Sequence, residues 1–366
     1  MIVEWILSGF VGLIIGILLQ DPLVKLYESI KNSIKRKYYT HKKGTNLTTS
    51  EFEFGDRKTS VIVIDGDGRK EYSKRNIQAR LNNSNDIPSP YQQEIDYFLC
   101  KTNALFSKMA QNNQSIPWNG KTISLTEYSL SRVDTSEDMT LDLELVLNEY
   151  YTTYSVITNL DEVCPSTNRS FSQYISAFDF TEPKSRYELP NSIGVCIQVF
   201  TKDYKTIFTR RSFSSGFRPG EYDVSVVEGL NLSDAHNGHI DFSEVVKRGC
   251  CEELCELQDS ELRVHLLGLF FDKKYNQWNI VGTVDLGISS EEIITRRNSG
   301  VDGKWELKSI DFINQDLKDI IVYLLTHKMW DMGVVTTYFA LLYKLMCSRD
   351  QINKMIKKYS VSDKSD

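Results

Sequence analysis

Charged residues cluster in one short, otherwise apolar stretch, KRGCCEELCEL (247–257). Arg248 comes one helical turn before the adjacent acids Glu252 and Glu253, and Glu256 comes one turn after Glu252. Like charges four residues apart on a helix repel by about 0.2–0.5 kcal/mol. Such a cluster becomes favourable when a hard divalent cation lies over it, because Mg²⁺ binds carboxylate oxygens and bridges to phosphate. The competing interpretation is a solvated acidic face.

A helix must position these residues, and the segment DFSEVVKRGCCEELCEL (241–257) predicts one. Asp241 or Ser243 is placed to cap its N-terminus. The apolar residues of the segment repeat with helical spacing and predict one buried face. Strands are expected on both sides of the helix. They are predicted at IGVCIQVF, TIFTRRS and EYDVSVV before it, and at ELRVHLLGLFFD, WNIVGTVDLG and KWELKSIDF after it.

This order of elements, with R-x3-E-E on the helix, resembles the Nudix hydrolases over roughly residues 190–346. The family's box can be written G-x5-E-x7-R-E-U-x-E-E-x-G-U, where U is apolar. Arg248 matches its arginine, and Glu252 and Glu253 match its paired glutamates. The resemblance implies that the two glutamates bind Mg²⁺, that Arg248 orients a carboxylate, and that water attacks a diphosphate linked to another group.

The sequence departs from the family's box at several positions. Gly249 stands where the family has a metal-binding glutamate, and Cys255 replaces the final glycine. Upstream, the expected glycine and glutamate fall on Asp234 and Ile240. A site that lacks one carboxylate has lost charge that catalysis uses. Asp241 and Glu256 are the candidates to compensate as further metal ligands, beside Glu252 and Glu253.

Two arginines, Arg210 and Arg211, end a predicted strand near the expected pocket. We expect one of the two side chains to face the phosphate of a substrate and the other to face solvent.

The composition restricts the class of protein. A net charge of −6 argues against a general nucleic-acid binder, which would carry a basic face. Seven cysteines without a C-x-x-C pair fit neither a disulfide framework nor a zinc ribbon, so reduced thiols are expected.

The first residues predict a membrane anchor. Residues 2–20 are apolar except for Glu4, Ser8 and Gln20, and they approach the length that a bilayer requires. Residues 1–43 carry seven basic and three acidic side chains, a net charge of +4, and the basic excess follows the apolar run. We therefore expect a single-pass membrane protein with the bulk of the chain cytoplasmic. A signal peptide and a buried or interfacial helix are the alternatives.

The anchor and the residues after it suggest two further contacts. Ser8, Gly12 and Gly16 recur every four residues and could pair two anchors in a homodimer. Residues 21–43 predict a basic juxtamembrane helix or stalk along the lipid surface.

The remaining chain divides at TEPKSRYELP, a charged stretch with two prolines. We predict an α+β domain of unknown role at 44–185, a Nudix-like domain at 190–350 and a polar tail at 351–366. In the first domain, YQQEIDYFLCKTNALFSKMA predicts a helix and LDLELVL (141–147) predicts a half-buried strand. The fold class expected is α+β, with a Nudix-like α/β/α sandwich and a single N-terminal transmembrane helix.

Two functions follow from these patterns. The first is a membrane-anchored, Mg²⁺-dependent hydrolase of a nucleoside diphosphate-linked compound. The second is a weakened or inactive relative that senses a nucleotide-like ligand and signals to the membrane segment or to a partner. A purely structural membrane adaptor would explain neither the paired glutamates nor the basic end of the strand.

Overall fold

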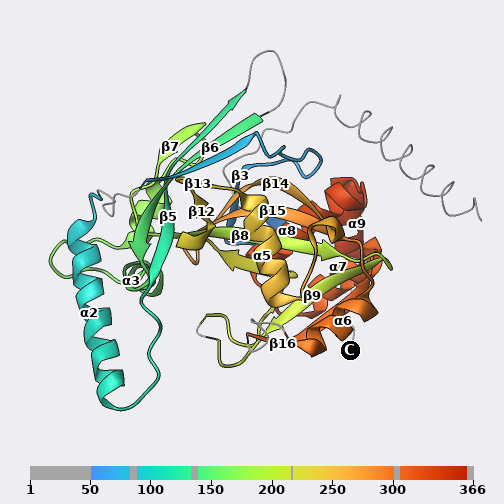
Figure 1. Cartoon of the computed structure of the whole chain (residues 1–366). Coiled ribbons are helices and arrows are strands. Elements are labelled where there is room, and N and C mark those ends of the chain that lie inside the picture. Colours follow the sequence, from blue (N-terminus) through green and yellow to red (C-terminus); the bar gives the residue numbers. More distant parts are fainter. Residues whose placement is uncertain (1–50, 83–88, 133–138, 216, 301–305, 361–366) are drawn as a thin grey trace, which may run out of the picture. The chain divides into compact units, whose positions relative to one another are not determined.

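The computed structural model of the chain describes residues 51–360, apart from 83–88, 133–138, 216 and 301–305 (Figure 1). In this part of the chain the fold is mixed α+β, built on an eight-stranded sheet and a six-stranded sheet. A small hairpin of β1 (Glu53–Phe54) and β2 (Arg57–Lys58) precedes both.

The eight-stranded sheet consists of β3 (Val61–Asp65), β8 (Ser192–Phe200), β9 (Lys205–Arg211), β10 (Tyr222–Asp223), β11 (Val226–Gly229), β14 (Leu262–Asp272), β15 (Gln277–Leu286) and β16 (Leu307–Asn314). Its strand order is β10-β9-β8-β15-β14-β3, with β11 paired to β8 and β16 paired to β9. The central strands β8 and β15 run parallel. Both are buried almost throughout, as expected for a sheet that is covered on both faces.

The two faces of this sheet belong to different cores. Its helices are α5 (Phe242–Glu253), α6 (Ser290–Ser299), α7 (Leu317–Thr326), α8 (Asp331–Lys344) and α9 (Arg349–Ser360). Alternate residues of a strand point to opposite faces. Val195 and Ile197 accordingly lie in the core with α5, while Cys196 between them lies in the core with α7, α8 and α9. Figure 1 shows α5 lying across the strands of this sheet.

The six-stranded sheet consists of β4 (Ile77–Asn82), β5 (Lys121–Arg132), β6 (Met139–Glu149), β7 (Lys184–Arg186), β12 (Ala235–His236) and β13 (His239–Ile240). Its strand order is β12-β13-β4-β6-β5-β7. The helices of this region are α2 (Gln92–Gln111), α3 (Tyr150–Thr158) and α4 (Phe171–Ala177), and two 3₁₀ turns, η1 (Leu232–Asp234) and η2 (Asp259–Glu261), flank α5. In Figure 1, α2 and α3 lie beside this sheet.

The two sheets exchange strands across the predicted domain boundary. β3, from the region predicted as the first domain, is the edge strand beside β14. The hairpin β12-β13, from the predicted Nudix-like domain, pairs with β4 of the other sheet. Its two-residue turn holds Asn237 and Gly238 at positive φ, the backbone conformation that hairpin turns of this length require. The division into domains at 44–185 and 190–350 stays a prediction.

Several predicted elements are confirmed, one helix is shorter than expected, and the strand predicted at EYDVSVV is divided into β10 and β11. The strand predicted at 141–147 lies within β6, and those predicted at ELRVHLLGLFFD and WNIVGTVDLG correspond to β14 and β15. The helix predicted at 91–110 is α2. The helix predicted at 241–257 ends at Glu253, so Glu256 lies beyond its C-terminus.

The predicted fold class and localisation are wrong in one respect, the transmembrane helix. Between residues 51 and 360, the described helices include none that combines the length and the apolar character needed to cross a bilayer. This finding overturns the fold class with a single transmembrane helix and the localisation as a single-pass membrane protein. The segments on which those predictions fell, 2–20 and 21–43, and the dimer face of Ser8, Gly12 and Gly16, lie outside the described residues.

Candidate functional site

The helix α5 carries the paired glutamates, and its start is fixed by its own sequence. Asp241 is the N-cap, and its Oδ1 accepts a hydrogen bond of 2.8 Å from the backbone N–H of Ser243. Capping of this kind contributes about 1 kcal/mol to helix stability. From this cap, the apolar residues Val245, Val246 and Cys250 face the sheet core. Arg248 and Glu252 lie one helical turn apart on a partly exposed face.

Arg248 is the centre of an ion-pair network. Its Nε lies 2.9 Å from Asp234 Oδ1, and its Nη1 lies 3.0 Å from Glu228 Oε1 and 3.3 Å from Glu252 Oε2. Its Nη2 donates to the carbonyl oxygen of Gly229 at 3.0 Å. One guanidinium therefore joins β11, the turn η1 and α5, and its single positive charge is shared among three carboxylates.

Glu253 lies in a different environment from its neighbour. Its side chain is only 9% exposed, and its carboxylate has no hydrogen bond or ion pair among the described residues. Burial raises the pKa of Glu253 well above its ordinary value, and the charges of Glu228 and Glu306 raise it further, while Arg211 opposes them. A buried carboxylate without a partner is costly when ionised. Glu253 is thus an acidic side chain that is buried on α5 without a partner for its carboxylate.

Gly249 lies where a side chain would meet β11. A Cβ on Gly249 would come 2.7 Å from Val226 Cγ1, 3.1 Å from Glu228 Cβ and 3.4 Å from Glu228 Cγ. The helix therefore packs so closely on the strand that the side chains of β11 fill the space beside residue 249. The carboxylate that the helix lacks at Gly249 is matched by one from the strand, that of Glu228. Burial, opposed by Arg248 and reinforced by the charge of Glu252, raises the pKa of Glu228 to about 7.

The predicted metal ligands are brought together only in part. Glu252 is 40% exposed and is paired with Arg248. Asp241 lies at the opposite end of α5 from Glu252 and Glu253, about 17 Å away at 1.5 Å per residue. It is engaged there as the N-cap and with Lys74 Nζ at 3.3 Å. Glu256 is exposed beyond the end of the helix.

These positions determine how well the residues fit Mg²⁺. Carboxylate oxygens are suitable donors for that ion. In the described part of the chain, however, no three acidic, histidine or cysteine side chains form a group that could hold a metal ion. Because the residues do not form such a group, we derive no catalytic step through a metal. Mg²⁺ as the cofactor and the metal-binding roles of Glu252 and Glu253 stay predictions.

Arg210 and Arg211 have different surroundings. Arg211 donates from Nε to the carbonyl oxygen of Phe217 at 3.1 Å, and its charge acts on Glu253. The guanidinium of Arg210 lies 5.1 Å from the ring centre of Phe213 and 5.0 Å from that of Tyr222. Arg211 therefore belongs to the carboxylate cluster and Arg210 to an aromatic group beside it.

Phe213 is an exposed ring between two cations. Its side chain is 60% exposed, and Lys308 Nζ lies 4.8 Å from its ring centre. Cation–π contacts of this kind contribute about 0.5–1 kcal/mol at exposed sites. An aromatic face with two cations beside it is suited to a ligand that has a ring and a phosphate.

Three residues of this site were missed or given no role by reasoning from the sequence. Glu228 follows an apolar strand, and no spacing rule connects it with a helix twenty residues later. Asp234 stands at a glycine position of the family's box, yet its Oδ1 and Oδ2 lie 2.9 and 3.0 Å from the Arg248 guanidinium. Arg297 on α6 donates to the carbonyl oxygens of Glu253 and Leu254 at the end of α5. Only the acidic character of Asp234 could have suggested a partner for Arg248.

Comparison with known proteins adds a weak likeness of fold. No family model and no curated protein matches this chain. The solved structure of DR0079 from Deinococcus radiodurans is 13% identical, with a TM-score of 0.30, and the match covers 44% of this chain and 89% of that one. The MutT protein from Methanosarcina mazei Go1 is 15% identical, with a TM-score of 0.27, and the match covers 42% and 95%. A likeness at these TM-scores carries no argument about activity.

Proposed function

We propose that this chain is a Nudix-like protein that binds a nucleotide-like, phosphorylated small molecule and does not hydrolyse it. The observation that carries the proposal is the closed space at Gly249. The resemblance to the family implies a carboxylate on the helix at that position, and here Val226 and Glu228 fill the space instead.

Loss of hydrolysis follows from how the remaining acids are used. Arg248 pairs with Glu228, Asp234 and Glu252, so that three of the acids near the helix are already engaged in ion pairs with one arginine. Catalysis by electrostatic stabilisation needs charge that is free to act on the reacting group. Ligand binding tolerates the loss of free charge better than catalysis does.

Binding is supported by the basic and aromatic groups next to the acids. Arg211 lies near Glu253, and Phe213 is exposed between Arg210 and Lys308. Arginine pairs with phosphate through parallel N–H donors, and aromatic rings stack on bases. These residues match the two halves of a nucleotide.

A Mg²⁺-dependent diphosphate hydrolase is the second candidate, and one observation favours it. Glu253 is buried without a partner and is crowded by Glu228. A divalent cation beside these two carboxylates would relieve their repulsion. Under this alternative, Glu252 and Glu253 would hold the metal ion and Arg248 would orient Glu252.

One experiment separates the two candidates. The full chain is incubated with Mg²⁺ and a panel of nucleoside diphosphates, triphosphates and nucleoside diphosphate esters, and both melting temperature and phosphate or monophosphate release are recorded. Binding without turnover raises the melting temperature and releases nothing. The Arg211→Ala variant loses this stabilisation, whereas Arg263→Ala, an exposed arginine on β14, keeps it. Multiple turnover that Glu253→Gln abolishes would establish the hydrolase instead.

A further inference from the structure

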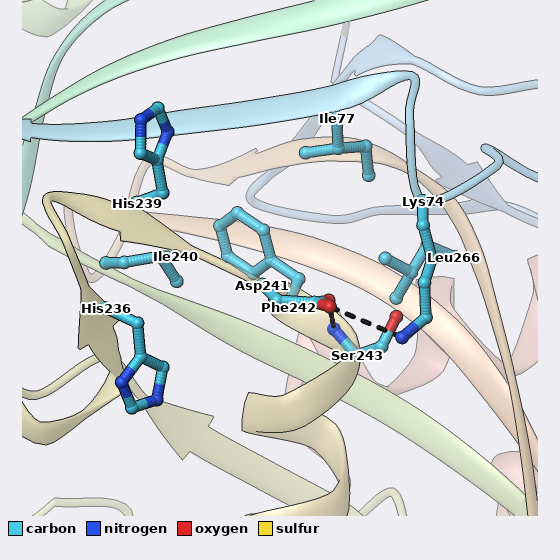
Figure 2. A pocket seen from close by; sticks show the side chains of 9 residues that line it. All are labelled: Lys74, Ile77, His236, His239, Ile240, Asp241, Phe242, Ser243 and Leu266. Atoms are coloured by element: carbon cyan, nitrogen blue, oxygen red, sulfur yellow. Dashed lines mark hydrogen bonds and ion pairs between the residues drawn. The ribbon is translucent and has the colours of Figure 1, made fainter.

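A pocket of about 220 Å³ opens at the N-terminal end of α5, about 17 Å along the helix from Glu253 (Figure 2). Its walls come from four separate segments. They are the chain leading into β4, the β12-β13 hairpin, the first residues of α5 and the strand β14. This pocket is distinct from the carboxylate cluster, and no function has been assigned to it above.

The walls of the pocket are mostly apolar. Ile77, Ile240, Phe242 and Leu266 line it, and Figure 2 shows the Phe242 ring and Ile77 among the side chains around this space. A partly open pocket of this size, with apolar side chains on its walls, accommodates a ring better than a chain, because a planar molecule contacts those walls with little loss of conformational entropy.

One edge of the pocket is polar. Ser243 is only 5% exposed, and its hydroxyl has no hydrogen-bond partner among the described residues although it lines the pocket. The hydroxyl reaches the open space of the pocket, so a ligand atom at that position can form a hydrogen bond with it. Beside it, Asp241 presents a carboxylate and Lys74 presents an ammonium group. In Figure 2 these three groups lie together, while His236 and His239 diverge on the hairpin side.

The charges at this edge restrict the ligand. Lys74 Nζ lies 3.3 Å from Asp241 Oδ2 and 3.8 Å from Glu244 Oε1, so the positive charge is already matched. An anion would meet Asp241, and a cation would meet Lys74. A neutral molecule avoids both conflicts, and it can accept a hydrogen bond from Lys74 and donate one to Asp241.

We propose that this pocket binds an uncharged heteroaromatic ring that carries both a hydrogen-bond donor and an acceptor on one edge. The polar edge of the ring forms hydrogen bonds with Ser243, Asp241 and Lys74. The faces of the ring contact Phe242, Ile77 and Leu266. Nucleobases and nicotinamide-type amides share this chemistry. The inference does not depend on the proposed function, because it concerns the other end of α5.

Calorimetric titration of the full chain with adenine, uracil and nicotinamide tests the proposal and distinguishes nucleobases from nicotinamide-type amides. At least one ring is expected to bind. Ser243→Ala and Asp241→Asn should each weaken binding about tenfold, the equivalent of 1.4 kcal/mol. Asparagine is as good an N-cap as aspartate, so Asp241→Asn leaves the helix intact.

The controls are Glu256→Gln, an acid-to-amide change beyond the end of α5, and Glu252→Gln at the carboxylate cluster. Both should bind the ring as the wild type does. The proposal is overturned if none of the three rings binds, or if a ring binds equally well to Ser243→Ala and Asp241→Asn. Binding of inorganic phosphate that depends on Lys74 would also overturn it, because the pocket would then be an anion site.

Discussion

Glu228 on β11 occupies the space beside Gly249 on α5, with its Cβ 3.1 Å from where a Cβ on residue 249 would lie. This relationship explains why a glutamate is absent from the helix. The close packing of α5 on β11 leaves no room for a side chain at 249, and the strand supplies a carboxylate next to it. The acidic site is therefore shared between a strand and a helix.

Enlarging Gly249 is expected to destabilise the fold. A Gly249→Ala methyl would approach Val226 Cγ1 to 2.7 Å, and overpacking of this kind costs about 1–3 kcal/mol. Urea unfolding of the full chain measures the loss. The second change Val226→Ala should recover part of it by removing the nearest atom. Equal stability of wild type and Gly249→Ala would show that α5 can move away from β11.

Replacing Glu253 by glutamine is expected to stabilise the protein at high pH. The folded-state pKa of Glu253 is raised, so its contribution to stability is complete below the ordinary pKa of 4.5 and is lost as the pH rises through the raised value. Glu253→Gln removes a buried charge without a partner and should gain about 1–3 kcal/mol at pH 8 relative to pH 5. Thermal melts at the two pH values measure this difference.

The matched control is Glu252→Gln on the same helix. Glu252 is 40% exposed and paired with Arg248, so this change should not produce the pH-dependent gain. If Glu253→Gln and Glu252→Gln respond alike at pH 5 and pH 8, the buried acid does not have the environment described here.

The carboxyl group of Glu228 should titrate near neutral pH. Burial raises its pKa to about 7 despite the opposing charge of Arg248. Carbon-detected NMR of the side-chain carboxyl groups, with Glu228→Gln used to assign the signal, should give a midpoint about two units above that of exposed glutamates. A midpoint near 4.5 would mean that water reaches this carboxylate freely.

A separate pH effect is expected at His265 on β14. Burial lowers the pKa of this histidine, but its hydrogen bonds to Asp285 and Glu71 and their negative charges outweigh burial, so the pKa is raised. Tyr343 Oη lies 3.0 Å from His265 Nδ1, and Lys344 Nζ lies 2.6 Å from Asp285 Oδ1.

A raised pKa gives the histidine contribution a definite sign. The contribution of His265 to the free energy of unfolding is fully present below the ordinary pKa of 6.5 and is lost as the pH rises through the raised value. The unfolding free energy should therefore fall above pH 6.5, and His265→Gln should flatten this dependence. An unchanged pH profile in that variant would exclude His265 as its source.

Reasoning from the sequence predicted the elements whose patterns are local. The apolar runs of β14 and β15 and the capped, periodic segment of α5 each contain their own signal. The segment EYYTTYSVITNL is rich in aromatic and β-branched residues typical of strands, yet it forms α3. There the packing of α3 against α2, through rings such as Phe106 and Tyr154, overrides the local preference.

The site was predictable only where its residues share one helix. Arg248 and Glu252 were placed correctly relative to each other because a helical turn relates them. Glu228 and Asp234 reach Arg248 through strand pairing and a turn, which no spacing in the sequence encodes. Asp241 and Glu256 do not join Glu252 and Glu253 because the first lies at the far end of α5 and the second lies beyond its terminus.

The most direct test of the account is a phosphorus NMR time course of the full chain with Mg²⁺ and the nucleoside diphosphate compound that stabilises it most. Binding without hydrolysis predicts broadened or shifted phosphorus resonances whose total intensity stays constant over time. Conversion of the diphosphate signals into monophosphate or inorganic phosphate, in amounts exceeding the protein and absent in Glu253→Gln, would contradict the account.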